Sequence, residues 1–257
     1  LEKDNKIIGA MVLNHEYDEC YNKLSWQIFA DDDEVLILHR LCIHPQYRGC
    51  GKFLIKQAIE IAKSGYTIHI MDGEYSQKVL EINKTLSFIG EGNNVIIRGT
   101  GNRAFSCTED GCNLEFINIT FANLISEETR SAALYIEGDG FLKVINCTFT
   151  DISAKFGAMQ LYTTGVADII NSTIKDVTCG VTRGSIVYIS GTGEYNFDNL
   201  SIINPKLSDS VTGAAVHLRT VFYLDNKDAT VTLTNSRITG ASGPMICLLY
   251  TSDAADD

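Results

Sequence analysis

The segment Asn113-Leu-Glu-Phe-Ile-Asn118-Ile-Thr-Phe121 begins a pattern that recurs four more times along the chain. The later copies are Phe141-Leu-Lys-Val-Ile-Asn146-Cys-Thr-Phe149, Val166-Ala-Asp-Ile-Ile-Asn171-Ser-Thr-Ile174, Glu194-Tyr-Asn-Phe-Asp-Asn199-Leu-Ser-Ile202 and Ala229-Thr-Val-Thr-Leu-Thr-Asn235-Ser-Arg-Ile238. In every copy the residues four before, two before and three after the asparagine are apolar. Alternation up to the asparagine predicts a strand with one buried face, and the change of step after it predicts a corner.

The repeated asparagine is expected to point inward at each corner, where its amide can bond the backbone of its own turn. Stacked coils would then hold an internal structural ladder made of Asn118, Asn146, Asn171, Asn199 and Asn235. Four of these also begin Asn-x-Ser/Thr sequons, and a further sequon begins at Asn83. We favour the ladder over glycosylation, because Asn235 keeps the repeat and lacks the sequon.

A second strand is expected in each unit, opened by glycine or serine and continued by small residues. These strands are predicted at 131–136, 157–162, 184–189, 213–218 and 243–246. The asparagines are spaced by 28, 25, 28 and 36 residues, as in a solenoid whose coils differ only in their loops. Shorter strands at 67–70, 79–82, 85–89 and 94–97, separated by glycine turns, are expected to form the first coils.

Two runs near the start of this region carry a family resemblance. They are Ser64-Gly-Tyr-Thr-Ile-His-Ile-Met-Asp-Gly-Glu-Tyr75 and Ile82-Asn-Lys-Thr-Leu-Ser-Phe-Ile-Gly90. Residues 64–246 resemble right-handed parallel β-helix domains of the pectate-lyase-like fold, above all the adhesin-like surface proteins of methane-producing archaea. The resemblance implies a mainly β solenoid, exported to the cell surface, that contacts carbohydrate or other cell-surface ligands.

The first quarter of the chain has a different pattern. Strands are predicted at 6–13 and 34–43, followed by a glycine-rich loop and a helix to about residue 63. A loop of this kind at a helix N-terminus can hold a pyrophosphate. It resembles the coenzyme-A motif of GNAT-family N-acetyltransferases, cytoplasmic enzymes, and by that resemblance acetyl-CoA would contact Gln46, Arg48, Gly49, Cys50, Gly51, Leu41 and Ile43.

A complete acetyltransferase would continue with further strands and a helix, whereas here the β-helix pattern begins. We therefore expect 1–63 to be a truncated α/β fragment, which would use acetyl-CoA only if it were functional. We expect 64–246 to need no cofactor. The helix at 52–63 should cover the open N-terminal end of the solenoid. Residues 247–257 resemble a translated sequencing adapter, so we expect a non-native tail and a chimeric or truncated gene model of metagenomic origin.

No catalytic or metal-binding residue is assigned, and the expected function is a non-catalytic surface scaffold. The alternatives are an acetyltransferase and a β-helix polysaccharide lyase or hydrolase. The candidate acids are scattered: Asp139, Asp151, Asp168, Asp176 and Asp198. Asp151 and Asp176 each follow a repeat asparagine by five residues and are expected to stack on one edge, whereas His217 is expected to be an exposed polar residue.

Composition narrows the classes of partner. The net charge is −11, and no basic patch suggests nucleic-acid binding. No apolar run is long enough to span a bilayer.

The eight cysteines form no CxxC pair. Cys107 and Cys112 could pair in an exported protein, while Cys147 and Cys179 are expected to be buried thiols.

Overall fold

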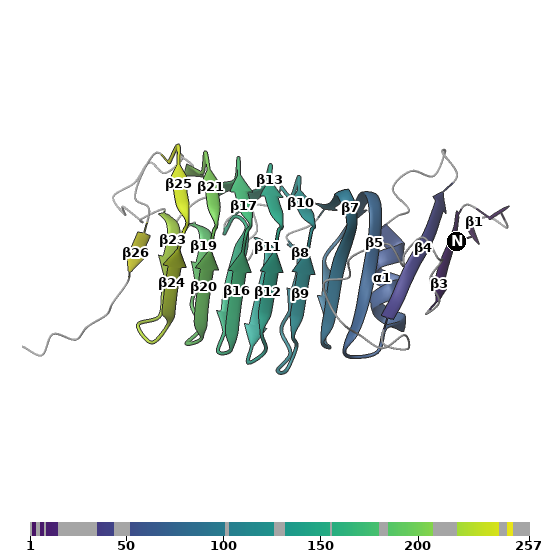
Figure 1. Ribbon diagram of the computed structural model, residues 1–257, viewed down its shortest axis with the longest axis horizontal. Helices are drawn as coiled ribbons and strands as arrows, with labels where there is room; N and C mark the ends of the chain where they lie inside the picture. The colour runs from purple at the N-terminus through teal and green to yellow at the C-terminus, as the bar shows by residue number, and fades with distance from the viewer. Residues whose placement is uncertain are drawn as a thin grey trace, which may run out of the picture.

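Successive coils stack in parallel and in register, which confirms the predicted parallel β-helix (Figure 1). The computed structural model describes residues 2–3, 6–7, 9–14, 35–43, 52–100, 103–125, 132–154, 156–179, 185–207, 220–241 and 246–248, with side chains described within 55–246. Three sheets run along the solenoid, with 14, seven and three strands among the described residues.

The front sheet contains two runs of strands that diverge from β7 (Leu86–Gly99). The first run is β9 (Leu114–Ile117), β12 (Leu142–Ile145), β16 (Val166–Ile170), β20 (Glu194–Asp198) and β24 (Thr230–Thr234). The second run, beyond the asparagine corner, is β10 (Thr120–Ala122), β13 (Thr148–Thr150), β17 (Thr173–Lys175), β21 (Ser201–Ile203) and β25 (Arg237–Thr239).

Two further sheets close the solenoid. The larger one contains β6 (Leu80–Ile82), β8 (Arg103–Cys107), β11 (Ala132–Gly138), β15 (Met159–Thr163), β19 (Ser185–Ile189), β23 (Thr220–Leu224) and β26 (Ile246–Leu248). The smaller one contains β14 (Ser153–Ala154), β18 (Thr178–Cys179) and β22 (Lys206–Leu207).

The apolar positions of the repeat form the core. In its first four copies, the predicted inward residues are at most 1% exposed, as at Phe116, Ile169 and Phe197. The fifth copy differs, because Leu233 is 41% exposed. Its strand, β24, ends the sheet, so no strand of the described chain pairs with its outer edge.

The first coils are built from longer strands than predicted. The glycine turns at 72–73 and 90–92 do not end strands; instead β5 (Tyr66–Gln77) and β7 run through them, with a register shift between Met71 and Gly73. Gly92 has a φ of 108°. The Asp72 carboxylate accepts a hydrogen bond from the backbone N–H of Asn94 at 2.8 Å. A glycine can adopt that φ inside a strand, so the chain bends without leaving the sheet.

Four of the five predicted second strands overlap observed ones: β11, β15, β19 and β26. The prediction at 213–218 lies outside the described residues, and His217 with it. The strand that pairs between β19 and β26 is β23, which follows that segment.

The N-terminal strands form a separate two-stranded sheet and an extension of the front sheet. A short pair, β1 (Glu2–Lys3) and β2 (Lys6–Ile7), precedes β3 (Gly9–Asn14), which pairs antiparallel with β4 (Val35–Ile43). β4 then pairs in parallel with β5, placing Val35 opposite Thr67. The strands predicted in the first quarter are therefore confirmed, and they join the solenoid edge to edge.

Helix α1 (Lys52–Ile61) covers the first coil, as expected, although it ends two residues earlier than predicted (Figure 1). Ile55, Ala58 and Ile59 are buried in the same hydrophobic cluster as Ile68 of β5. The ammonium of Lys84 donates to the carbonyls of Ile59 and Ala62, at 2.9 and 2.8 Å. Carbonyls at a helix C-terminus lack partners within the helix, so a cation stabilises them there.

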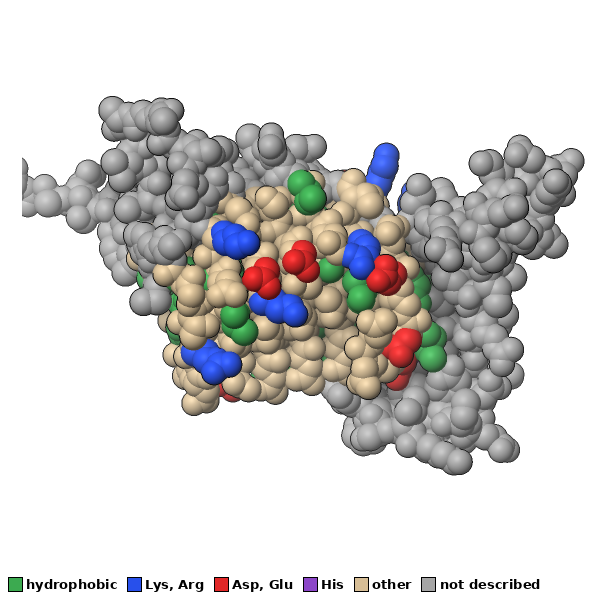
Figure 2. Space-filling model, turned by 90° about the horizontal axis from the view of Figure 1, so that it is seen from above, with side chains coloured by type: hydrophobic (Ala, Val, Ile, Leu, Met, Phe, Trp, Pro, Cys, Tyr) green, Lys and Arg blue, Asp and Glu red, His purple; other side chains and the backbone are tan. Residues whose placement is uncertain are grey.

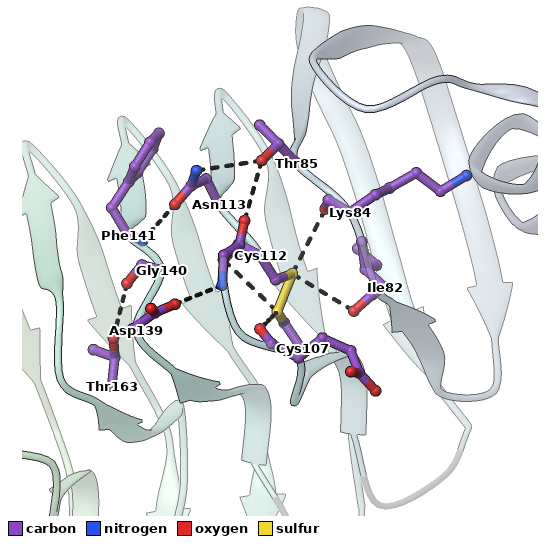
Figure 3. The surroundings of a disulfide bond; sticks show 12 residues. Ile82, Lys84, Thr85, Cys107, Cys112, Asn113, Asp139, Gly140, Phe141 and Thr163 are labelled. Carbon is purple, nitrogen blue, oxygen red and sulfur yellow. Dashed lines mark hydrogen bonds between the residues drawn. A yellow bond between two sulfur atoms is a disulfide. The ribbon is translucent and has the colours of Figure 1, made fainter.

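The cysteines divide as the sequence indicated. Cys107 and Cys112 form a disulfide at the turn between β8 and β9, with Ile82 and Lys84 of the preceding coil beside it (Figure 3). Cys147 and Cys179 are buried thiols, as predicted. Burial raises the pKa of Cys147 from 9.0 to about 12. Across the described part of the chain, no helix is both long and apolar enough to traverse a bilayer.

Replacing Lys84→Met should lower the free energy of unfolding by about 1–3 kcal/mol, because two buried carbonyls lose a charged donor. Urea unfolding at pH 7 measures this. Lys78→Met, an exposed lysine on the turn before β6, is the matched control and should change the stability little. Equal effects of the two substitutions would show that Lys84 does not hold the helix.

Cys147 should react with iodoacetamide far more slowly in the folded protein than in urea at pH 8, because the thiol stays protonated and buried. Its folded pKa lies above its unfolded value, so its contribution to stability is complete below pH 9. That contribution is lost as the pH rises toward 12. Peptide mass spectrometry identifies the alkylated cysteine. Equally fast alkylation in both states would contradict the buried position.

Candidate functional site

The residues proposed for acetyl-CoA are only partly placed. Gln46, Arg48, Gly49, Cys50 and Gly51 lie outside the described residues. Leu41 and Ile43 belong to β4, where they pair with Met11 and Gly9. β4 ends at Ile43 and α1 begins at Lys52, so a strand and a helix flank the segment that carries the motif, as predicted.

The repeat asparagines do not point inward, which corrects the predicted internal ladder. Asn146, Asn171, Asn199 and Asn235 are exposed, and Asn118 is half-buried. All five have a φ between 50° and 56°. Asparagine adopts this left-handed region more readily than other non-glycine residues, so the corner selects it for its backbone.

The inward position belongs to the residue after the asparagine. Ile119, Cys147, Ser172 and Leu200 are each 1% exposed. The asparagines nevertheless stack coil on coil, and the Asn199 amide donates to the Asn171 side-chain oxygen at 2.9 Å. A small or apolar residue follows the asparagine in all five copies of the repeat. This pattern could have predicted that the residue after the asparagine points inward.

A second left-handed corner lies five residues after the first. Asn123, Asp151, Asp176 and Asn204 have a φ between 49° and 54°, and Gly240 occupies this position in the last coil. The expected stacking of Asp151 and Asp176 on one edge is confirmed, because Thr150 pairs in register with Lys175 and each aspartate follows at the same corner of its coil. Asp151 and Asp176 therefore form corners of the backbone. The other candidate acids, Asp139, Asp168 and Asp198, lie elsewhere on the coils.

Asp139 and Asp198 each accept hydrogen bonds from the neighbouring coil. The Asp139 carboxylate accepts a hydrogen bond from the Gly111 amide at 2.5 Å (Figure 3). Asp198 accepts from the Asn235 amide and the Thr234 hydroxyl, both at 2.8 Å, and these bonds lower the pKa of its carboxyl. Neither carboxylate is directed toward another candidate acid.

Asp168 belongs to a polar row that sequence reasoning missed. In-register pairing of β7, β9, β12, β16 and β20 aligns Ser87, Glu115, Lys143, Asp168 and Asn196. We call these five residues the polar row. Their core-facing neighbours are buried on both sides, so the row faces outward from the front sheet. Each residue stands two positions after the start of its predicted strand segment. The alignment of the repeats on the asparagine was used to find the shared apolar positions, and the polar position between them was not considered.

Hydrogen bonds and an ion pair connect the row from coil to coil. The Ser87 hydroxyl donates to Glu115 Oε2 at 3.1 Å, and Lys143 Nζ lies 3.3 Å from Glu115 Oε1. The Asn196 amide donates to Asp168 Oδ1 at 2.9 Å. The Lys143 side chain is 40% exposed and that of Glu115 only 11%, so the ammonium is the accessible charge of the pair.

The seven-stranded sheet carries a row of tyrosines, whereas the front sheet carries the polar row. Ring centroids lie 5.4–5.6 Å apart along Tyr135, Tyr162, Tyr188 and Tyr223. Tyr188 and Tyr223 form a second hydrophobic cluster apart from the main core and are at most 7% exposed. Burial, then a hydrogen bond to Asp225, raises the pKa of Tyr188. Tyr135, Tyr188 and Tyr223 are buried and Tyr162 is half-buried, so the row offers a ligand little stacking surface.

The exterior that Figure 2 shows is mixed in charge. Acidic and basic side chains alternate over that face, and hydrophobic side chains form small separate spots. Small, separate hydrophobic spots of this kind are ordinary on a protein surface.

Comparison with known families finds a similarity over part of the chain. Residues 1–81 match the model of the Acetyltransferase (GNAT) family. The match covers less than a third of the chain and extends past the predicted boundary at residue 63 to include β5. A search of curated proteins finds no match.

Two solved structures illustrate the solenoid likeness. One is a mutant of the PL6-family alginate lyase AlyGC, with 13% identity and a TM-score of 0.38 over 75% of this chain and 38% of that one. The other is the pectin methylesterase of Aspergillus niger, with 14% identity and a TM-score of 0.40 over 80% of this chain and 88% of that one. The chain therefore spans well under half of the lyase.

Asn171→Ala should lower the free energy of unfolding by about 1–2 kcal/mol, because alanine resists the left-handed region. Asn171→Gly should cost less, because glycine adopts it freely. Urea unfolding of protein made without glycosylation compares the two. If glycine costs as much as alanine, the amide bond from Asn199 is the stabilising feature and the backbone argument fails.

Proposed function

We propose that this chain is a non-catalytic, adhesin-like β-helix of a cell surface that contacts carbohydrate, similar in kind to the surface proteins of methane-producing archaea. The observation that carries the proposal is the polar row on the front sheet. Strands in a sheet lie about 4.8 Å apart, so the row offers a line of polar groups at regular intervals. A linear polysaccharide presents hydroxyl or carboxylate groups along its length in the same way.

The row has hydrogen-bonding capacity left for a ligand. Lys143 Nζ has three donors, and a single ion pair with Glu115 is observed. Asp168 uses Oδ1 to accept from Asn196, and the Asn196 carbonyl oxygen is an acceptor. An accessible ammonium flanked by acceptors suits a glycan with acidic and neutral groups.

The same geometry argues against catalysis at Glu115. Its two oxygens accept from Ser87 and Lys143, and little of the side chain is exposed. A general acid or base must reach the reacting atom of the substrate. Export is supported independently by the Cys107–Cys112 disulfide, because disulfides persist in oxidising surroundings outside the cytosol.

Lys143→Met should weaken binding to the preferred polysaccharide about tenfold or more, as expected for loss of a charged hydrogen bond. A panel of neutral and acidic polysaccharides, tested by affinity electrophoresis, identifies that ligand. Lys175→Met is the matched control, since Lys175 is exposed on β17, away from the row. Failure of the wild-type chain to bind any polysaccharide in the panel, or equal loss in both variants, would contradict the proposal.

A polysaccharide-cleaving enzyme is the second candidate, because Glu115, Lys143 and Asp168 bring acids and a base onto one face. Incubation with the same panel, followed by assays for new reducing ends and for unsaturated uronate, tests it. Cleavage that disappears in Glu115→Gln would favour the enzyme over the scaffold.

An acetyltransferase is the third candidate, favoured by the family match over residues 1–81. Calorimetric titration of the full chain with acetyl-CoA tests whether the loop at 44–51 binds it. The proposed chimeric origin and the adapter-like tail concern the gene. The predicted tail begins at residue 247, yet Cys247 and Leu248 lie in β26, where they pair with Tyr223 and Leu224, and residues 249–257 lie outside the described residues. Long-read sequencing of the locus tests both.

A further inference from the structure

We propose that the corner asparagines are N-glycosylation acceptors used on alternate coils, with glycans on Asn146 and Asn199 and none on Asn171 between them. The inference rests on the cell-surface location in the proposed function. It does not involve the polar row, which lies on a different part of each coil.

Each of the three asparagines begins an acceptor sequence, and each is exposed. The hydroxyl residue two positions later is half-buried at the start of the next strand, at Thr148, Thr173 and Ser201. The amide and the hydroxyl of each sequon are therefore both at the surface. Glycosylation adds a bulky polar group and requires such a position.

The expectation that these amides are internal was the reason to prefer a purely structural role. The left-handed backbone removes that reason, because it satisfies the corner and leaves the side chain outside. One bond joins neighbouring amides, from Asn199 Nδ2 to Asn171 Oδ1. A glycosylated Nδ2 keeps one N–H, so Asn199 can carry a sugar and still donate this bond.

Stacking sets the alternation. Adjacent corners are one strand spacing apart, about 4.8 Å. Two branched glycans attached that closely would overlap, whereas glycans two coils apart are separated by about twice that distance. Among three consecutive exposed sequons, the largest number that avoids adjacent sugars is two. These are the outer pair, Asn146 and Asn199.

The full chain is secreted from a eukaryotic host, and the folded protein is treated with peptide N-glycosidase in heavy-oxygen water. Mass spectrometry then reads each former acceptor, and intact mass gives the number of glycans per molecule. We expect glycans at Asn146 and Asn199 and at least a tenfold lower occupancy at Asn171. Absence of glycan from both outer sites, or molecules with Asn171 and Asn199 both occupied, would overturn the proposal.

A double variant separates crowding from inaccessibility. Thr148→Ala with Ser201→Ala removes the outer sequons and keeps every corner asparagine, so the fold is preserved. Occupancy of Asn171 should then rise at least severalfold. If it does not rise, crowding is not the cause and the alternation is wrong.

Asn235 provides a matched control in the last coil. It has the same corner geometry but lacks a sequon, because Arg237 stands at the hydroxyl position. Arg237→Thr should create an acceptor that competes with Asn199, and coexisting glycans at both would contradict crowding. Polysaccharide binding, measured on the same preparation, reports on the proposed function separately, so either proposal can fail alone.

Discussion

The solenoid depends on a left-handed backbone at two points in each coil. All nine described non-glycine residues with positive φ are asparagine or aspartate at these two corners. The first corner changes the direction of the chain between β12 and β13, for example, while both strands keep their apolar residues inside. Without that turn, the alternation of one strand would place the next strand's apolar residues in solvent.

Parallel pairing then multiplies the effect of the corner. Each coil repeats the same inward sequence, so aromatic rings stack on their equivalents, as Phe121 does on Phe149 with centroids 4.9 Å apart. The same pairing aligns surface groups that are far apart in sequence, including Glu115 and Lys143. Core and polar row are therefore two consequences of one register.

The N-terminal segment shows how an unrelated pattern can join this architecture. β4 supplies a strand edge that β5 pairs with, and α1 supplies an apolar face for the first coil. β5 lies both in the segment matched to acetyltransferases and in the first coil of the solenoid. A parallel strand that follows a helix meets the needs of both patterns, since each buries it within a sheet.

The sequence predicted the fold well because apolar alternation reports directly on burial. It located the strands of four coils and the helix that covers the first. The prediction that the corner asparagines point inward was wrong. A polar residue between two apolar runs can point inward with its amide hydrogen-bonded, or can point outward where the corner needs its left-handed backbone. The exposure and the φ of the asparagines distinguish these cases. The polar row escaped notice because Ser87, Glu115 and Lys143 share no chemistry, and only the pairing register brings them together.

Two coils of the solenoid, from Asn118 to Asn146 and from Asn171 to Asn199, have the same length of 28 residues. Each keeps its strands in register with the adjacent coil. Such coils are interchangeable parts. Recombination between them could lengthen or shorten the molecule by a whole turn while every remaining interface kept its form, so reach could evolve separately from stability.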